Sequence, residues 1–70
     1  MNATVSKAYL MGIKEGRAFL TNNPDLNTEE MERCLSQCKR LARGFSDDLK
    51  DMFKGEADFW KHQISIRKKA

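Results

Sequence analysis

Apolar residues in the middle of the chain recur at steps of three or four, the spacing of one face of an α-helix. This seam consists of Met31, Cys34, Leu35, Cys38, Leu41 and Ala42, with Phe45 just beyond it. Asn27 and Glu30 stand at its start with the spacing of a capping box, and Gly44 at its end is a residue type that ends helices in a left-handed conformation. The pattern predicts a helix over residues 28–43.

Two further helices are predicted, one before and one after this helix in the sequence. Residues 3–21 form the first, and the turn-forming run 22–25, which holds the only proline of the chain, ends it. Ser46 is expected to cap the third, over residues 46–66, with Asp47 and Asp48 in its first turn. We therefore predict a single all-α domain over residues 1–70, a three-helix fold in which a helical hairpin is followed by a long C-terminal helix.

The third predicted helix carries two apolar stripes about a quarter-turn apart. Its first stripe consists of Leu49, Phe53, Ala57, Trp60 and Ile64, and its second consists of Met52, Phe59 and Ile66. The first two helices can cover both stripes within one chain. The alternative is that another chain buries the overhanging end of this longer helix.

We favour the second arrangement because the chain is short. A domain of 70 residues buries only about 60% of its unfolded surface, and small domains usually compensate with disulfides, a metal or self-association. We therefore expect an intertwined homo-oligomer, with a dimer favoured. The residues expected at its interface are Met52, Phe59, Ile66, Leu10 and Met11.

Two glycines, Gly12 and Gly16, interrupt the apolar face of the first predicted helix. Each costs about 1 kcal/mol of helix propensity relative to alanine, so such a pair indicates that a backbone or a bulky ring approaches closely there. Trp60 and Phe53 are the rings that we expect in this groove. The sequence thus predicts close helix packing at Gly12, Gly16 and Trp60.

The residues that could carry chemistry do not combine into a recognisable site. Cys34 and Cys38 share one helical face and His62 offers a third zinc ligand, but a fourth ligand and a short knuckle are missing. Both cysteines lie in the apolar seam, where a free thiol behaves as a small hydrophobe. The sequence also lacks a nucleophile–base pair and a cofactor motif. We therefore predict that the protein is not an enzyme and has neither a metal site nor a cofactor.

Charge and cysteine content limit the partners and the cellular compartment that we expect for the chain. Its 13 basic and 10 acidic side chains give a formal charge of +3, which is too balanced to indicate nucleic acid by itself. No apolar run is long enough to span a membrane, so no membrane partner is expected. Two cysteines do not make a disulfide framework, and the start of the chain lacks the pattern of a secretory signal. We expect a cytoplasmic protein.

A basic surface on the second predicted helix leaves one alternative partner open. Its candidates for contact with nucleic acid or with an acidic partner are Arg33, Lys39, Arg40 and Arg43. The competing interpretation pairs these bases with Glu29 and Glu32 on the same helix as a solvated surface. No aromatic or base-reading residues accompany the patch, so we favour a protein interaction module over a nucleic-acid-binding regulator.

Three blocks of the sequence carry a resemblance to a known group of proteins. They are the runs 9–17 (YLMGIKEGR), 44–46 (GFS) and 58–63 (DFWKHQ). These blocks resemble those of small proteins from short reading frames in the early exo-xis region of lambdoid temperate phages, and the similarity covers most of the chain. The resemblance implies a non-enzymatic, helical and oligomeric accessory protein of the bacterial host cytoplasm, which influences phage development through an unknown host or phage protein. It implies no functional residues.

Overall fold

The computed structural model describes residues 6–69, which form three α-helices and no strand. The helices are α1 (Lys7–Asn22), α2 (Thr28–Gly44) and α3 (Asp47–Lys69). The predicted all-α, three-helix fold is therefore confirmed for this part of the chain. Residues 3–5, which were included in the first predicted helix, lie outside the described residues, and α3 runs on to residue 69 instead of ending at residue 66.

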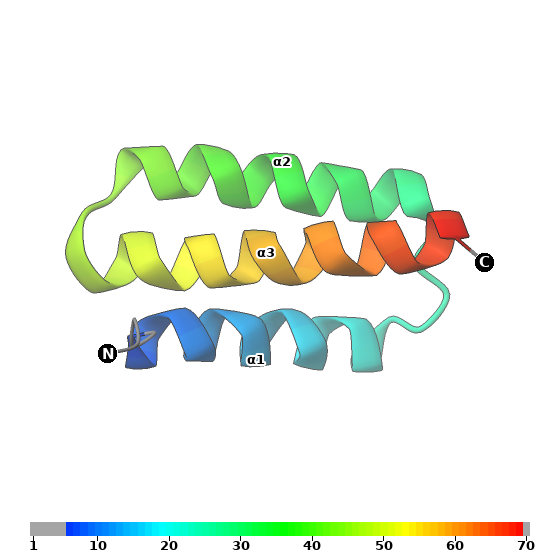
Figure 1. The fold of residues 1–70 in the computed structure, drawn as a ribbon, viewed down its shortest axis with the longest axis horizontal. Coiled ribbons are helices and arrows are strands. Elements are labelled where there is room, and N and C mark those ends of the chain that lie inside the picture. Colours follow the sequence, from blue (N-terminus) through cyan, green and yellow to red (C-terminus); the bar gives the residue numbers. More distant parts are fainter. Residues whose placement is uncertain (1–5, 70) are drawn as a thin grey trace.

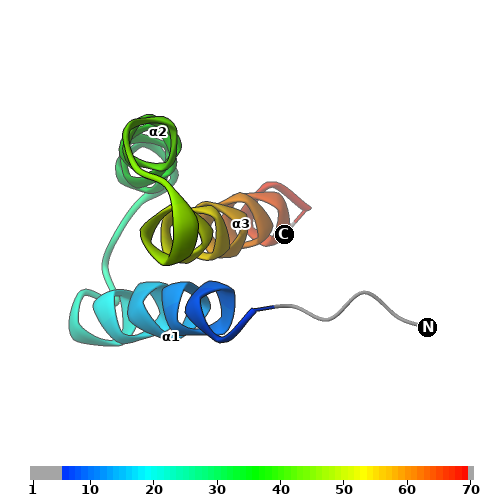
Figure 2. The same cartoon turned by 90° about the vertical axis from the view of Figure 1, so that its left-hand side faces the viewer.

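The middle position in the bundle belongs to α3, and the other two helices lie along it (Figure 1). Helix α1 runs parallel to α3, whereas α2 runs antiparallel to it. Figure 2 shows α2 nearly end-on, with α3 between α2 and α1, and shows that α1 and α3 cross at an angle. Within the described residues, no Cα atom of α1 lies within 8 Å of a Cα atom of α2. The bundle therefore depends on two separate faces of one helix.

Hydrogen-bonded caps fix where the first two helices begin. The Ser6 hydroxyl accepts a hydrogen bond from the Tyr9 backbone N–H at 3.1 Å, so α1 begins at Lys7. At the start of α2, the Asn27 side chain accepts from the Glu30 N–H at 2.8 Å, and the Glu30 carboxylate accepts from the Asn27 N–H at 2.9 Å. This reciprocal pair is the predicted capping box.

The short connection between α2 and α3 differs from the prediction. Gly44 is the last residue of α2, and the expectation that it is left-handed is wrong, since the positive φ of this turn, 57°, belongs to Asp47. Phe45 lies between them in an extended conformation, with φ −123° and ψ 168°. The chain therefore leaves α2 through an extended residue and completes its reversal at Asp47, whose short polar side chain tolerates a left-handed backbone.

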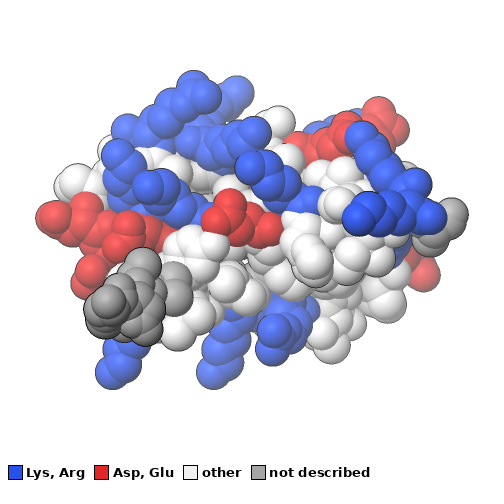
Figure 3. Space-filling model, in the orientation of Figure 1, with Lys and Arg blue, Asp and Glu red and all other residues white. Residues whose placement is uncertain are grey.

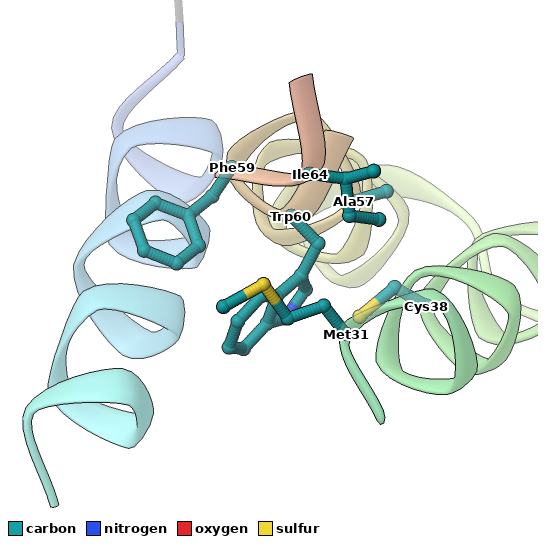
Figure 4. Close-up of a cluster of buried hydrophobic side chains, with 6 residues drawn as sticks. All are labelled: Met31, Cys38, Ala57, Phe59, Trp60 and Ile64. Carbon is teal, nitrogen blue, oxygen red and sulfur yellow. The ribbon is translucent and has the colours of Figure 1, made fainter. Parts of the chain in front are cut away.

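Both apolar stripes of α3 are used within the chain. Trp60 and Met31 are the most deeply buried large side chains, and Met31 of α2 lies over the Trp60 ring (Figure 4). Ala57 and Ile64 of the first stripe lie on the α2 side, whereas Phe59 of the second stripe points toward α1 (Figure 4). The buried hydrophobic residues of the described chain are Met31, Cys38, Ala42, Ala57, Phe59, Trp60 and Ile64.

Two glycines allow the backbones of α1 and α3 to touch. A Cβ atom added at Gly12 would collide with the Met52 carbonyl oxygen, and one added at Gly55 would collide with the Tyr9 carbonyl oxygen. Both glycines are buried. Gly55 thus contributes to the same close approach from the opposite helix.

A third glycine, Gly16, makes room for a ring. A Cβ atom at this position would lie 2.6 Å from the nearest ring atom of Phe59. The contact is of the kind predicted for the glycine face of α1, but the ring that enters is Phe59 instead of Trp60 or Phe53. Trp60 lies between α1 and α2 (Figure 4), and its ring packs edge-to-face with Phe19 of α1, with 6.0 Å between ring centroids.

Alanine at Gly12 or Gly55 is expected to destabilise the fold, although alanine favours helix by about 1 kcal/mol over glycine. The added methyl group would meet backbone carbonyls, which cannot rotate away, so the two helices must move apart and lose packing. We expect each variant to lose about 1–3 kcal/mol in the free energy of unfolding, measured by urea denaturation. Gly44→Ala is the control, because nothing lies within 4 Å of its added Cβ. Equal stability of Gly12→Ala and Gly44→Ala would contradict the close helix contact.

Candidate interaction surfaces

The second stripe of α3 does not form a free surface. Phe59 was expected to join copies of the chain, but only 9% of it is exposed, and its ring packs against Gly16 of the same chain. It also meets the edge of Trp60, with 5.0 Å between ring centroids. The structure therefore places Phe59 in the core of its own chain. The physical reason is that Gly16 offers a recess that fits a phenyl ring.

The other residues of the predicted interface are not brought together. Met52 is half-buried over Gly12, whereas Leu10, Met11 and Ile66 are exposed by 53%, 53% and 47%. Because α1 and α3 run parallel, Leu10 and Met11 near the start of α1 lie at the opposite end of the bundle from Ile66 near the end of α3 (Figure 1). These residues cannot act as one continuous patch.

An apolar group at the α2–α3 turn was missed as a surface. The turn cluster consists of Phe45, Leu49 and Phe53, of which Phe45 is 43% and Leu49 is 47% exposed. The rings of Phe45 and Phe53 lie 5.6 Å apart between centroids, and Leu49 precedes Phe53 by one helical turn. Sequence reasoning assigned Leu49 and Phe53 to the core stripe. The stripe is apolar along its whole length, but Leu49 at its start is exposed.

The predicted basic surface divides into two parts. Arg33 and Arg40 border a shallow depression together with acidic residues, and Arg33 lies 3.9 Å from Glu29 in an exposed ion pair. Lys39 and Arg43 instead line a groove between α2 and α3. Figure 3 shows Lys and Arg side chains gathered over α2 on the face of the molecule that is nearest in Figure 1. The predicted set of four bases is therefore not one contact surface.

The groove brings in two further bases that were not among the predicted contact residues. Lys50 and Lys54 of α3 line it opposite Lys39 and Arg43. Their i, i+4 spacing places them on one face of α3. Residues 46–60 hold more acids than bases, and this composition does not show on which side of the helix the two lysines lie.

Hydrogen bonds from α1 hold the acids at the edge of this groove. The Ser6 hydroxyl donates to the Asp51 carboxylate at 3.1 Å, and the Tyr9 hydroxyl donates to the Asp58 carboxylate. The bond to Asp58 is the main cause of a raised pKa of Tyr9, because it stabilises the protonated phenol, and burial and the charge of Asp58 add to it. Both contacts fasten α1 to α3 where the groove borders α1.

The two cysteines lie in a setting that suppresses the thiolate. Cys38 is 5% exposed and Cys34 is half-buried. Burial, with a smaller contribution from the charge of Glu56, raises the pKa of Cys34 and raises that of Cys38 to about 12. Among residues 6–69, no group of three His, Cys, Asp or Glu side chains is placed to hold a metal ion. The cysteines therefore act as packing residues on the α2 side of the core.

Alkylation of Cys38 by iodoacetamide at pH 8 is expected to be at least about tenfold slower in the folded chain than in urea, because so little thiolate forms in the folded state. A Cys34→Ser variant isolates the Cys38 signal, and mass spectrometry follows the reaction. Equal rates in buffer and in urea would show that this thiol is not buried as described.

Glu56 is the one partly buried acid on α3 whose environment disfavours its charge. Burial is the main cause of a raised pKa of Glu56, and the negative charge of Glu15 on α1 adds to it. The folded chain therefore holds this proton to a higher pH than the unfolded chain does. The contribution of Glu56 to stability consequently falls as pH rises from the ordinary pKa of about 4.3 through the raised value, and it stays low above that range.

Glu56→Gln is expected to stabilise the chain at pH 7 more than at pH 4, because the amide removes the cost of burying a charge. Urea unfolding of both proteins at pH 4, 5, 6 and 7 measures the difference in the free energy of unfolding. Asp25→Asn, at an exposed position between α1 and α2, is the control for loss of one acid. A difference between Glu56→Gln and the parent chain that does not change with pH would contradict the assignment.

Two general findings complete the description of the surface. No helix within residues 6–69 has an apolar stretch that is long enough to cross a membrane. Comparison with protein-family models, with curated proteins and with solved structures found no significant match to the chain. Any function is therefore argued from the residues of this chain alone.

Proposed function

We propose that the protein is a small helical interaction module that forms a dimer through the end of the bundle carrying the turn cluster. The observation that supports this is the distribution of exposed apolar side chains. Of the six large hydrophobic residues that are exposed in the described chain, four lie at this end: Leu10, Met11, Phe45 and Leu49. Single exposed apolar residues are ordinary, but a group of this kind marks an interaction surface.

A second copy of the chain is the partner that best fits this end. An apolar cluster can pack against its own copy about a two-fold axis, because such a contact needs only self-complementary shape. The turn cluster is flanked by charges of both signs, Asp47, Asp48 and Lys50. A rim of mixed sign avoids repulsion between identical surfaces. Self-association also adds buried area to a chain that is too short for a large core.

The same proposal covers the biological setting. The resemblance of the runs 9–17 and 58–63 to small lambdoid phage proteins supports a non-enzymatic phage accessory protein that works in the bacterial cytoplasm. In this proposal the dimer leaves its outer helical surface free for a host or phage protein whose activity it modulates. Leu10 and Met11 stay predicted interface residues, while Ile66 at the far end is available to such a partner.

Leu49→Asp tests the dimer directly. The charge should be tolerated in the single chain because Leu49 is 47% exposed, but it should weaken an apolar interface at its centre. We expect the dissociation constant of the dimer to rise at least about tenfold, with helicity by circular dichroism unchanged. Sedimentation equilibrium at several protein concentrations, with reducing agent, measures that constant.

Ser65→Asp is the matched control, since it adds the same charge at an exposed position of the same helix, toward the other end of the bundle. It should leave the dissociation constant of the dimer unchanged. If Leu49→Asp dimerises as tightly as the parent chain, the turn cluster is not the interface. If both variants dissociate equally, net charge and not the turn cluster governs association.

A further inference from the structure

The groove between α2 and α3 has a floor of small residues and walls of basic ones. Ala42 of α2 and Ala57 of α3 line it and are 8% and 7% exposed, so both alanines are buried and leave depth above them. The groove has a volume of about 640 Å³. Its basic lining residues are Lys39, Arg43, Lys50 and Lys54. Two of them come from each helix.

The antiparallel course of α2 and α3 sets the order of these bases along the groove. Arg43 and Lys50 lie near the turn, and Lys39 and Lys54 lie one helical turn further from it. Four residues of helix span about 6 Å. Further bases follow along the same seam, since Lys39 also borders a second depression with Lys61 and Lys68 of α3, where Lys68 pairs with Glu32. Positive charge therefore extends in a line and is not confined to one point.

None of these four bases has an acidic partner among the described residues, a property that they share with most other bases there. Elsewhere Arg33 lies 3.9 Å from Glu29, and Lys68 lies 3.7 Å from Glu32. Within residues 6–69, no carboxylate oxygen lies within 4.0 Å of the charged nitrogens of the four groove bases. Bases that share a groove repel each other. Two acids, Asp51 and Asp58, also line this groove, on its α1 side.

The acids at the groove edge are directed to α1. Asp51 accepts a hydrogen bond from the Ser6 hydroxyl and Asp58 accepts one from the Tyr9 hydroxyl. These bonds occupy carboxylate oxygens on the α1 side of the groove. The side formed by α2 carries bases only, and Figure 3 shows the gathering of positive charge over this helix.

We propose that this groove binds the phosphodiester backbone of a nucleic acid without reading its sequence. A row of bases along an open groove matches a linear polyanion, and the guanidinium of Arg43 can hold two oxygens of one phosphate, while the lysines act as point charges. Phosphodiesters stay charged at any cellular pH. Tyr9 is the one aromatic residue among the described lining residues, and its hydroxyl is bonded to Asp58 on the α1 side. No carboxamide lines the groove, so sequence-specific contact with base edges is not expected.

The proposal differs from the sequence-based alternative in its residues. Arg33 and Arg40 are not part of this groove, whereas Lys50 and Lys54 are. It also does not depend on the turn cluster, whose residues do not line the groove. Loss of the dimer and loss of nucleic-acid binding can therefore be observed separately.

Fluorescence anisotropy with two labelled 20-nucleotide probes, a mixed-sequence DNA duplex and one of its single strands, tests the proposal. The parent chain should bind at low salt, and the logarithm of its affinity should fall with the logarithm of salt concentration with a slope of about −3 to −4, as four phosphate contacts require. The double variant Lys50→Gln/Lys54→Gln should raise the dissociation constant at least about tenfold and reduce the magnitude of the salt slope by about 2. Comparison of the two probes shows which form of the backbone the groove prefers.

Lys7→Gln/Lys14→Gln is the matched control, because it removes the same charge from exposed positions on α1 that do not line the groove. It should bind within about twofold of the parent chain. Circular dichroism establishes that both double variants are folded. Absence of binding by the parent chain at low salt, or equal losses in the two double variants, would overturn the proposal. Binding of a polyglutamate peptide as tight as that of DNA, with the same dependence on Lys50 and Lys54, would also overturn it and assign the groove to an acidic protein segment.

Discussion

The backbone contact between α1 and α3 at Gly12 and Gly55 is the constraint on which the rest of the structure depends. Each glycine lies against a carbonyl of the other helix, so the two helices approach more closely than side chains would allow. This approach brings Gly16 to the ring of Phe59 and the Ser6 hydroxyl to Asp51. This backbone contact thus sets both the register of α1 along α3 and the distance between the two helices.

The contact also decides which surfaces are left free. Because α1 takes the second stripe of α3 and α2 takes the first, the two outer helices have no close backbone approach to each other in the described chain. Trp60 fills the space between them, with Met31 over its ring (Figure 4). The remaining apolar surface is concentrated at the end that holds the α2–α3 turn, and the α2–α3 seam carries the bases. A small chain therefore presents two chemically different surfaces on different residues.

Local chemistry made the helices predictable from the sequence. The seam of α2 and the reciprocal cap of Asn27 and Glu30 depend only on residues close together in the chain, and the structure contains both. The glycine face of α1 was recognised for the same reason, since an apolar helical face rarely carries two glycines. The prediction of a left-handed Gly44 failed because the chain continues through the extended Phe45, so that the left-handed residue of the turn is Asp47.

The arrangement of the surfaces was not predictable in the same way. Whether Phe59 or Trp60 enters the recess at Gly16 depends on the parallel register of α1 and α3, which no local pattern encodes. Leu49 belongs to the same apolar stripe as the buried Trp60, yet it is 47% exposed. To predict the bases of the groove, one must know which side of α3 faces α2. A count of charges along the sequence does not give that orientation. Relative placement of helices, in each case, decided the outcome.

The register of α1 on α3 is the central claim, and nuclear Overhauser contacts measure it most directly. The position of a Cβ added at Gly12 is 2.8 Å from the Glu56 backbone nitrogen, and that of one added at Gly55 is 3.2 Å from the Tyr9 Cα. The account predicts strong cross-peaks from a Gly12 Hα to the Glu56 amide proton and from a Gly55 Hα to the Tyr9 Hα. Gly12 and Gly55 protons that show contacts only within their own helices would contradict it.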